Sequence, residues 1–326
     1  MDKMRRFAIL PIAMLVLAAC QSADRGDPSS PPTTEESTAA STEESISPSM
    51  EESEPAASEA AGGAICESDP GDGYLARVCE AGVLLVSTDP AYPPQSSLNE
   101  STGDFEGFDI AVATEIADRL GVEVQFETPT FDAVVAGSWS ERWDVSVGSV
   151  TVTEDRKAVL DFTEPYYFTP AQLAANAESG ITDMEGLAGA TICVGEATTY
   201  LDWIEGSLTL PAEAGDVADP PEGATSTTLP TDLDCAESWR SGRSDFDGWL
   251  SSITTVQATI DEEYPVVAVG DPVFFEPLAV AFDKSVEDND SLVEAVDGIV
   301  AAMHEDGTLT AMSEEWYGGE DLTTQE

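Results

Sequence analysis

The chain has 326 residues, with 64 acidic and 12 basic side chains and a formal net charge of −52 at pH 7. A surface this negative repels a polyanion, so the composition excludes nucleic acid as a partner. The sequence has one histidine, His304, in a helix expected at residues 292–305, and no Gly-rich phosphate loop with its lysine. These features argue against Ser-His-Asp, Cys-His and phosphate-loop chemistry.

The first 20 residues, MDKMRRFAILPIAMLVLAAC, have the pattern of a secretion signal. A basic start precedes an apolar run that is too short to span a membrane. Residues 17–20 also match the lipobox of bacterial lipoproteins, in which the signal is cleaved before the cysteine and that cysteine carries lipid. We therefore expect Cys20 to anchor the protein at the extracytoplasmic face of the cell membrane. The alternative is a plain secreted protein in which Cys20 falls in the signal by chance.

Residues 21–64 consist mainly of Ser, Thr, Glu, Pro and Ala and include no aromatic residue. Such a segment cannot bury enough apolar surface to offset its ordering entropy, so we expect a disordered tether. Repulsion between the glutamates, together with stiff prolines, should extend this tether away from the membrane.

Residues 65–326 suit either one large domain or two of ordinary size. A helix is expected at residues 109–120, because its apolar residues share one face and Gly121 can end it in a left-handed turn. Val122, Val124 and Phe126 then alternate as in a strand. Helices alternating with strands indicate parallel α/β sheets, in which ligands bind beyond the carboxyl ends of the strands.

The segment DVSVGSVTVTEDRKAVLDFTEPYYF, residues 144–168, suggests a binding turn. Its alternating valines predict a strand that ends in small residues, where a ligand can approach the backbone. Arg156 follows in an expected helical turn, and a guanidinium there can hold a carboxylate by charge-assisted bonds of roughly 1.5–3 kcal/mol each. The alternative is a surface arginine paired with Glu154 or Asp155.

Several segments carry motifs in a fixed order: VSTDPAYPPQ, GFDIAVATEIADRLG, FDAVVAGSWSERWD, TVTEDR and EDGTLTAMSEEWYGG. In order, spacing and residue types they resemble the family 3 extracellular solute-binding proteins, the receptors of polar amino-acid uptake ABC transporters. The resemblance runs from about Cys79 to Gly319. It implies an α/β clamshell of the periplasmic-binding-protein type, with two lobes and a two-crossing hinge.

This resemblance also implies the domain limits. Residues 65–170 would form the first lobe and residues 171–274 the second, while residues 275–326 would return to the first lobe with its C-terminal helices. The two crossings would lie near residues 167–171 and 274–279.

Without Cys20, four cysteines remain, an even number in a secreted protein. Three pairings are possible. We favour Cys66–Cys79, which would staple the tether's end to the first strand, and Cys193–Cys235, which would fall inside the second lobe. Free buried thiols are the alternative, and with no CxxC motif and one histidine we expect no metal site.

The resemblance implies most of the ligand site. Apolar walls would come from Tyr92 and Phe131, although a core aromatic is the usual fate of such residues. The ligand's ammonium and carboxylate would be held by backbone groups of Gly148 and Val150, the hydroxyl of Thr151 and the guanidinium of Arg156.

In the second lobe, ICVGEATTYLDWI resembles the motif VGVxxGTTxxxYL. Thr198 and Thr199 would lie at a helix N-terminus, where free amides favour an anion. The alternative role for these threonines is ordinary capping.

Two positions depart from the family pattern. Ala197 replaces a glycine, which matters only if that residue needs a positive φ. Ser252 falls where an aspartate normally binds the ligand's α-amino group, and a serine cannot supply that charge. Asp89 or Glu276 could substitute for it, unless both are simply solvated.

The sequence therefore predicts a monomeric binding protein that needs no cofactor, is not an enzyme and closes two lobes on an amino acid or a related small zwitterion. It would deliver this ligand to the permease of an ABC transporter. One alternative is a lyase resembling cyclohexadienyl dehydratase, acting on arogenate or prephenate with Glu276 as a candidate acid. Another is a ligand-sensing module for a separate receptor.

Overall fold

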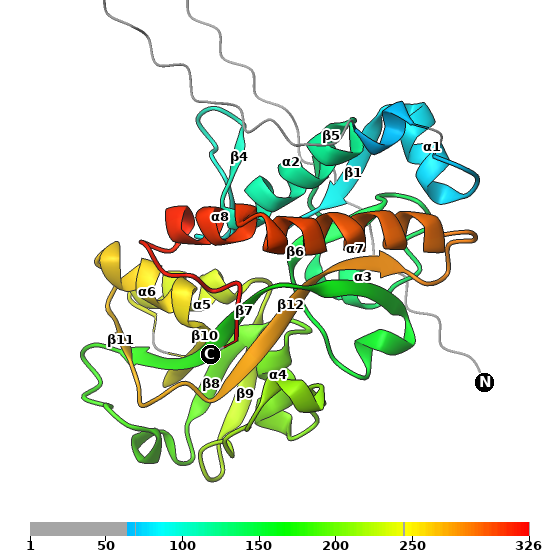
Figure 1. Cartoon of the computed structure of the whole chain (residues 1–326). Coiled ribbons are helices and arrows are strands. Elements are labelled where there is room, and N and C mark those ends of the chain that lie inside the picture. The colour runs from blue at the N-terminus through cyan, green and yellow to red at the C-terminus, as the bar shows by residue number, and fades with distance from the viewer. Residues whose placement is uncertain (1–63, 69, 244, 326) are drawn as a thin grey trace, which may run out of the picture. The chain divides into compact units, whose positions relative to one another are not determined.

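The computed structural model describes residues 64–68, 70–243 and 245–325. The expected signal peptide with Cys20 and the expected tether up to residue 63 lie outside the described residues. The described residues form two lobes joined by two long strands (Figure 1). No helix among them combines the length and apolarity needed to cross a membrane.

The first lobe is built on a parallel sheet with the strand order β5–β1–β6. Its strands are β1 (Val83–Ser87), β5 (Glu123–Glu127) and β6 (Val145–Thr151). Its helices are α1 (Tyr74–Ala81), α2 (Phe108–Leu120), α3 (Phe131–Val135), α7 (Asp290–Glu305) and α8 (Thr308–Trp316). A small antiparallel sheet lies beside α2 and contains β2 (Ala91–Tyr92), β3 (Ser96–Leu98) and β4 (Phe105–Glu106).

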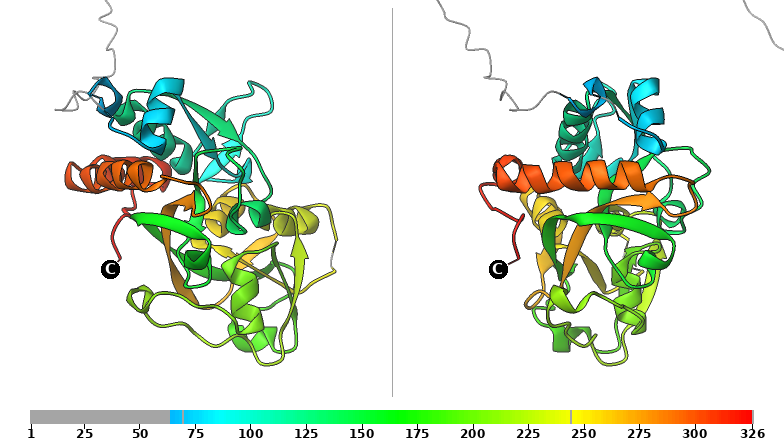
Figure 2. Two further views of the ribbon diagram at one scale, coloured as in Figure 1. Left: turned by 90° about the vertical axis from the view of Figure 1, so that its right-hand side faces the viewer. Right: turned by 45° about the vertical axis from the view of Figure 1, so that its right-hand side comes forward.

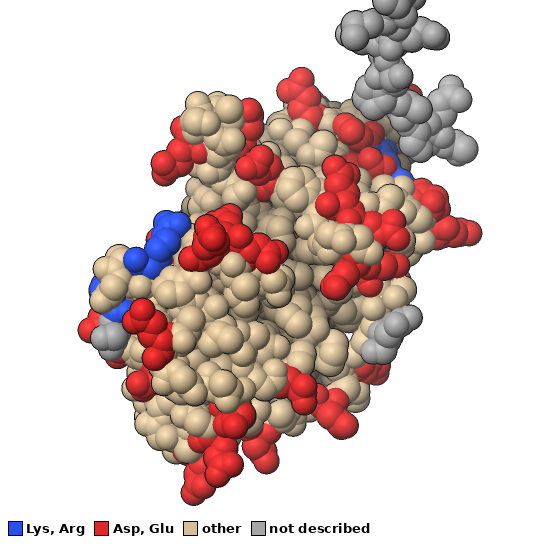
Figure 3. Space-filling model, turned by 90° about the vertical axis from the view of Figure 1, so that its left-hand side faces the viewer, with Lys and Arg blue, Asp and Glu red and all other residues tan. Residues whose placement is uncertain are grey.

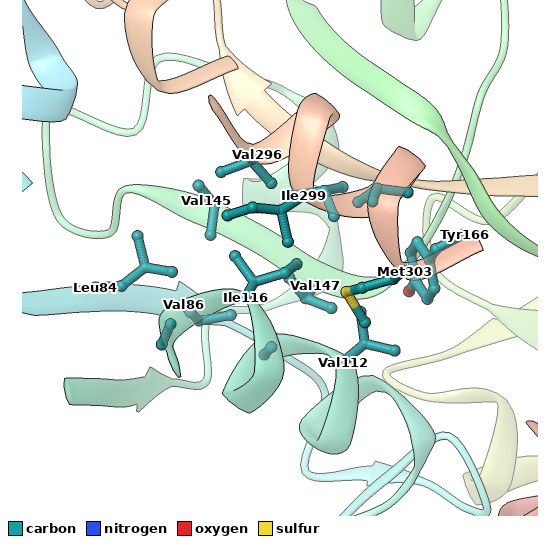
Figure 4. Packing of buried hydrophobic residues seen from close by; sticks show 14 of the residues in the cluster. Leu84, Val86, Val112, Ile116, Val145, Val147, Tyr166, Val296, Ile299 and Met303 are labelled. Carbon is teal, nitrogen blue, oxygen red and sulfur yellow. The ribbon is translucent and has the colours of Figure 1, made fainter. Parts of the chain in front are cut away.

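The core of the first lobe lies between this sheet and its helices (Figure 4). Ile116 and Val112 of α2 face the sheet from one helix, and Ile299 and Met303 of α7 face it from another. The strands contribute buried side chains between them: Leu84, Val86, Val145 and Val147. The apolar face expected at residues 109–120 is thus the buried face of α2, and Gly121 ends that helix with a φ of 86°.

The second lobe contains the parallel strands β10 (Gly248–Ser252), β8 (Thr191–Gly195) and β9 (Thr225–Leu229), in that order. Its helices are α4 (Thr199–Glu205), α5 (Asp232–Arg240) and α6 (Ile253–Asp261). A short strand, β11 (Val266–Ala268), pairs with the crossing strand β7. The remaining elements of the described residues are short 3-10 helices: η1 (Ile65–Glu67), η2 (Arg156–Ala158), η3 (Met184–Leu187) and η4 (Ala212–Ala214).

Two long strands pass between the lobes, β7 (Leu160–Asn176) and β12 (Phe274–Asp283) (Figure 2). They pair antiparallel, with β12 also beside β6 and β7 also beside β10. The parallel strands of the two lobes, which we expected, are therefore joined by the antiparallel crossing strands into one mixed sheet. The reason is topological. The chain leaves the first lobe along β7 and returns to it along β12, and these two strands pair side by side. Prolines interrupt both strands, at Pro165, Pro170 and Pro277.

Both of the favoured disulfides are present in the structure. Cys66 and Cys79 are 5.3 Å apart at Cα, and Cys193 and Cys235 are 5.9 Å apart. The first bond joins η1 to α1, not to the first strand, because Cys79 lies in the helix that precedes β1. The second joins β8 to α5 inside the second lobe.

Acidic side chains are spread over the surface of the described residues. Figure 3 shows one face on which Asp and Glu lie over both lobes and Lys and Arg gather in a few places. This distribution fits the formal net charge of −52.

Candidate ligand-binding site

A cavity of about 50 Å³ lies between the lobes. The first lobe contributes the loop after β1 and the end of β6, and the second lobe contributes the loops after β8 and β9. Both sets of loops leave the carboxyl ends of parallel strands, which is where α/β sheets bind ligands. Nine of the predicted site residues line the cavity: Asp89, Tyr92, Phe131, Gly148, Thr151, Arg156, Thr198, Thr199 and Glu276.

Val150 and Ser252 do not line this cavity. The prediction for Val150 concerned its backbone groups and stays a prediction; its side chain is buried in a cluster with Trp139. Ser252 begins α6, and its buried hydroxyl accepts a hydrogen bond from the amide of Thr255 at 3.2 Å. Ser252 therefore cannot act as a direct substitute for an amine-binding aspartate in this arrangement.

Arg156 is buried, with 7% of its surface exposed. Its Nη1 donates to the carbonyl of Thr151 at 3.0 Å, and its Nη2 donates to the carbonyl of Ala197 in the second lobe at 3.1 Å. The guanidinium carbon lies 5.3 Å from the ring centre of Phe131. Burial lowers the pKa of Arg156, while the negative charge of Glu276 opposes this shift.

The alternative interpretation of Arg156 as a surface residue paired with Glu154 or Asp155 is wrong, because Arg156 is buried and none of the ion pairs among the described residues involves it. Glu154 instead pairs with Lys157 at 2.9 Å. Three of the five N–H groups of Arg156 remain after its two bonds to carbonyls, so it can still donate hydrogen bonds to a ligand's carboxylate.

The end of β6 is held in a bend at Ser149, whose φ is 55°. Its hydroxyl donates to the carboxylate of Asp109 at 2.7 Å, and its amide donates to the hydroxyl of Tyr166 at 3.2 Å. Gly148 precedes the bend, and a side chain there would stand 3.3 Å from the backbone of Thr88. The bend thus depends on a buried polar network behind the cavity.

Asp109 is fully buried in this network and also accepts from Tyr166 at 2.7 Å. Burial raises the pKa of Asp109 to about 7, against the two hydrogen bonds that lower it.

Ala197 has a φ of 60°, in the left-handed region that glycine adopts freely. The departure from the family's glycine therefore matters, because a left-handed alanine costs about 1 kcal/mol. Ala197 also supplies the carbonyl that Arg156 binds across the cavity, so its conformation helps to join the lobes.

Thr198 caps α4, with its hydroxyl accepting from the amide of Leu201 at 3.4 Å and donating to the carbonyl of Gly195 at 2.9 Å. The hydrogen bonds of Thr198 are therefore those of an ordinary helix N-cap. Thr199 differs, because its hydroxyl donates to the carboxylate of Glu276.

Glu276 lies on β12 and is 1% exposed. Its carboxylate accepts from the hydroxyl of Thr151 at 2.7 Å and from that of Tyr200 at 2.8 Å, in addition to Thr199. Burial raises the pKa of Glu276, and these hydroxyl donors lower it. One buried carboxylate thus binds donors from both lobes.

Several lining residues were not predicted from the sequence: Ser149, Gly195, Glu196, Tyr200, Pro230, Thr231 and Asp232. Asp232 matters most, since it is a buried carboxylate at the start of α5. Its Oδ1 accepts from the amide of Gly195 at 2.6 Å. Burial raises its pKa to about 8, and the charges of Glu276 and Asp89 add to the shift. The sequence did contain a sign of this position, because Thr231 and Asp234 form a capping box that follows a strand.

Comparison with known proteins assigns the chain to a family. Residues 84–319 match the bacterial extracellular solute-binding proteins, family 3. The L-cystine-binding protein TcyJ of Escherichia coli is 30% identical over 253 residues, which cover 76% of this chain and 88% of that protein. The L-cystine-binding protein TcyA of Bacillus subtilis is 26% identical over 76% of this chain and 86% of its own length.

Solved structures show the same fold. An ancestral arginine-binding protein bound to arginine has a TM-score of 0.62 and 26% identity, covering 73% of this chain and 99% of its own. The ancestral amino-acid-binding protein AncCDT-1, a precursor of cyclohexadienyl dehydratase, has a TM-score of 0.63 and 25% identity, covering 74% of this chain and 99% of its own. The chain belongs to the bacterial extracellular solute-binding proteins, family 3.

Proposed function

We propose that this protein is the substrate-binding lipoprotein of an ABC transporter, which captures an amino acid or a related small zwitterion and delivers it to a membrane permease. Membership of the solute-binding family supports the class of function. The observation that carries the proposal is the buried guanidinium of Arg156, which lines an interlobe cavity and keeps N–H groups available.

In this proposal the ligand's carboxylate binds Arg156, and its apolar part lies against Tyr92 and Phe131. The lobes close on the ligand, since Arg156 and Glu276 each bind groups of both lobes. A ligand favours closure to the extent that it makes contacts available only when the lobes meet. The lipid at Cys20 would keep the receptor near its permease.

A thermal-shift screen tests the binding function. The chain without residues 1–20 is mixed with each amino acid and with small organic acids. A ligand present at 100 times its dissociation constant should stabilise the fold by about 2.7 kcal/mol. Calorimetric titration of the best ligand should then give saturable binding with one site. A screen without any stabilising compound would contradict the proposal.

A second candidate function is a dehydratase activity, which one observation favours. Glu276 is a buried carboxyl in the cavity, and burial raises its pKa, as a general acid requires. Incubation of the purified protein with arogenate or prephenate decides this point, because turnover would identify a lyase. Binding without turnover favours transport or sensing, and neighbouring permease and ATPase genes would separate those two.

A further inference from the structure

The cavity is lined by an excess of carboxyl groups over cationic groups. Among the described residues that line it, four have carboxylates, Asp89, Glu196, Asp232 and Glu276, and one has a cationic side chain, Arg156. A ligand with equal positive and negative charge would leave this excess in place. The charges around the cavity therefore bear on which class of amino acid it accepts.

Three hydroxyl donors that line the cavity are already occupied. Thr151, Thr199 and Tyr200 all donate to Glu276, which is buried and belongs to the crossing strand β12. An incoming carboxylate would compete with Glu276 for these donors, so Arg156 is left as its charged partner. Glu276 lies beside that position as an acceptor for a positive group of the ligand.

Two further carboxylates, one from each lobe, retain acceptor capacity. Asp89 of the first lobe accepts from the amide of Ala91 at 2.7 Å, within its own turn. Asp232 of the second lobe accepts from the amide of Gly195 and, at 3.4 Å, from the hydroxyl of Ser251. A carboxylate has about four acceptor positions, so neither is saturated.

Neither Asp89 nor Asp232 forms an ion pair with a Lys or Arg of the described residues. Both line the same cavity, Asp89 from the first lobe and Asp232 from the second. A cation between them would partner one carboxylate of each lobe at once.

We infer that the cavity selects amino acids with a second positive group, a side-chain ammonium or guanidinium that binds between Asp89 and Asp232. This inference rests on the proposed function. The ligand's α-carboxylate binds Arg156 and its α-ammonium binds Glu276. Its side-chain cation binds the two remaining carboxylates, Asp89 and Asp232. The cation also links the lobes, so it contributes to closure as well as to selectivity.

The test compares ligands that differ in charge and hardly in shape. Arginine is titrated against citrulline and lysine against norleucine, by calorimetry at pH 8, on the chain without residues 1–20. Each cationic ligand should bind roughly tenfold to a hundredfold more tightly than its neutral partner. Asp89→Asn and Asp232→Asn should each reduce this preference at least several-fold. Asp219→Asn, which removes an exposed carboxylate of the second lobe, should preserve it.

The outcomes separate the inference from the function on which it rests. Equal binding of arginine and citrulline, or of lysine and norleucine, would overturn the inference and leave the amino-acid receptor intact. A preference unchanged in both asparagine variants, each shown to be folded by circular dichroism, would overturn it too. If the protein bound no amino acid at all, that result would contradict the proposed function itself.

Discussion

Gln95 of the first lobe donates a 3.0 Å hydrogen bond from its Nε2 to the hydroxyl of Ser252 in the second lobe. Both side chains are fully buried. The same Nε2 donates to Thr254 at 2.8 Å, and Thr255 donates to Oε1 of Gln95 at 3.4 Å. A neutral amide and hydroxyls therefore join the lobes beside the cavity, at the position where the family's pattern led us to expect an aspartate.

This contact gives a first prediction. Gln95→Ala leaves buried hydroxyls of the second lobe without their partner when the lobes are closed, at a cost of about 1–3 kcal/mol. The closed form should become rarer, and ligand affinity should fall roughly fivefold to a hundredfold. Calorimetric titration measures the change. Gln125→Ala, at an exposed position on β5, is the matched control, and equal affinities in the two variants would contradict the role of Gln95.

Arg156 should be the main partner of the ligand's carboxylate. Arg156→Ala should abolish detectable binding, because this guanidinium is the one cation among the described residues that line the cavity. Arg156→Lys should restore little, since an ammonium cannot reproduce the two-pronged geometry. Lys157→Ala removes the neighbouring charge from an exposed ion pair and should bind normally. Near-normal affinity in Arg156→Ala would defeat the assignment.

The two disulfides should differ in their contribution to stability. The bond from Cys193 to Cys235 spans 42 residues and that from Cys66 to Cys79 spans 13. Chain entropy alone gives about 4 and about 3 kcal/mol respectively. We expect the double serine variant at Cys193 and Cys235 to lower the melting temperature more than the variant at Cys66 and Cys79. Scanning calorimetry of both variants measures this order, and a reversed order would show that packing outweighs loop length.

Stability should depend on pH through two buried carboxyls. The pKa values of Asp109 and Asp232 are about 7 and about 8 in the folded protein, raised first by burial. Both exceed the value of about 3.9 expected in an unfolded chain, so folding favours the protonated forms. The contribution of each carboxyl to the free energy of unfolding is fully present below about pH 4. It is lost as the pH rises through the pKa that the carboxyl has in the folded protein.

The free energy of unfolding should therefore fall between pH 5 and pH 8, by up to about 1.4 kcal/mol per pH unit for each group. Asp232→Asn should flatten this dependence, because its side chain no longer titrates. Urea unfolding of the ligand-free protein at several pH values measures the slope. An unchanged slope in Asp232→Asn would mean that this carboxyl is ionised throughout.

The anchoring of the protein is tested at Cys20. We expect Cys20→Ser to release the protein into the medium or the periplasm, because lipid cannot attach to serine. Fractionation of cells followed by immunoblotting measures the distribution. A variant whose signal is cleaved and which still stays in the membrane fraction would speak against lipid anchoring.

The sequence predicted those parts of the protein that local patterns specify. The apolar face of α2, the strand at β6 and the position of Arg156 follow from periodicity and from short motifs. Asp232 escaped prediction because it reaches the cavity only when β8 and β9 are placed side by side. Glu276 was weighed as a candidate, but its three hydroxyl partners come from segments that are 76 to 125 residues away along the chain. Such contacts depend on the tertiary arrangement, which no local pattern contains.

The prolines of β7 and β12 have a mechanical consequence. Pro165 and Pro170 face Ala279 and Phe275 in the register, and Pro277 faces Phe168. Proline has no amide hydrogen, so none of these three residues can donate a backbone hydrogen bond to a neighbouring strand where the chain passes between the lobes. The register also shifts between Leu278 and Ala279. The pairing of the crossing strands is thus irregular between the lobes, and we expect the ribbon to twist there when the lobes move relative to one another.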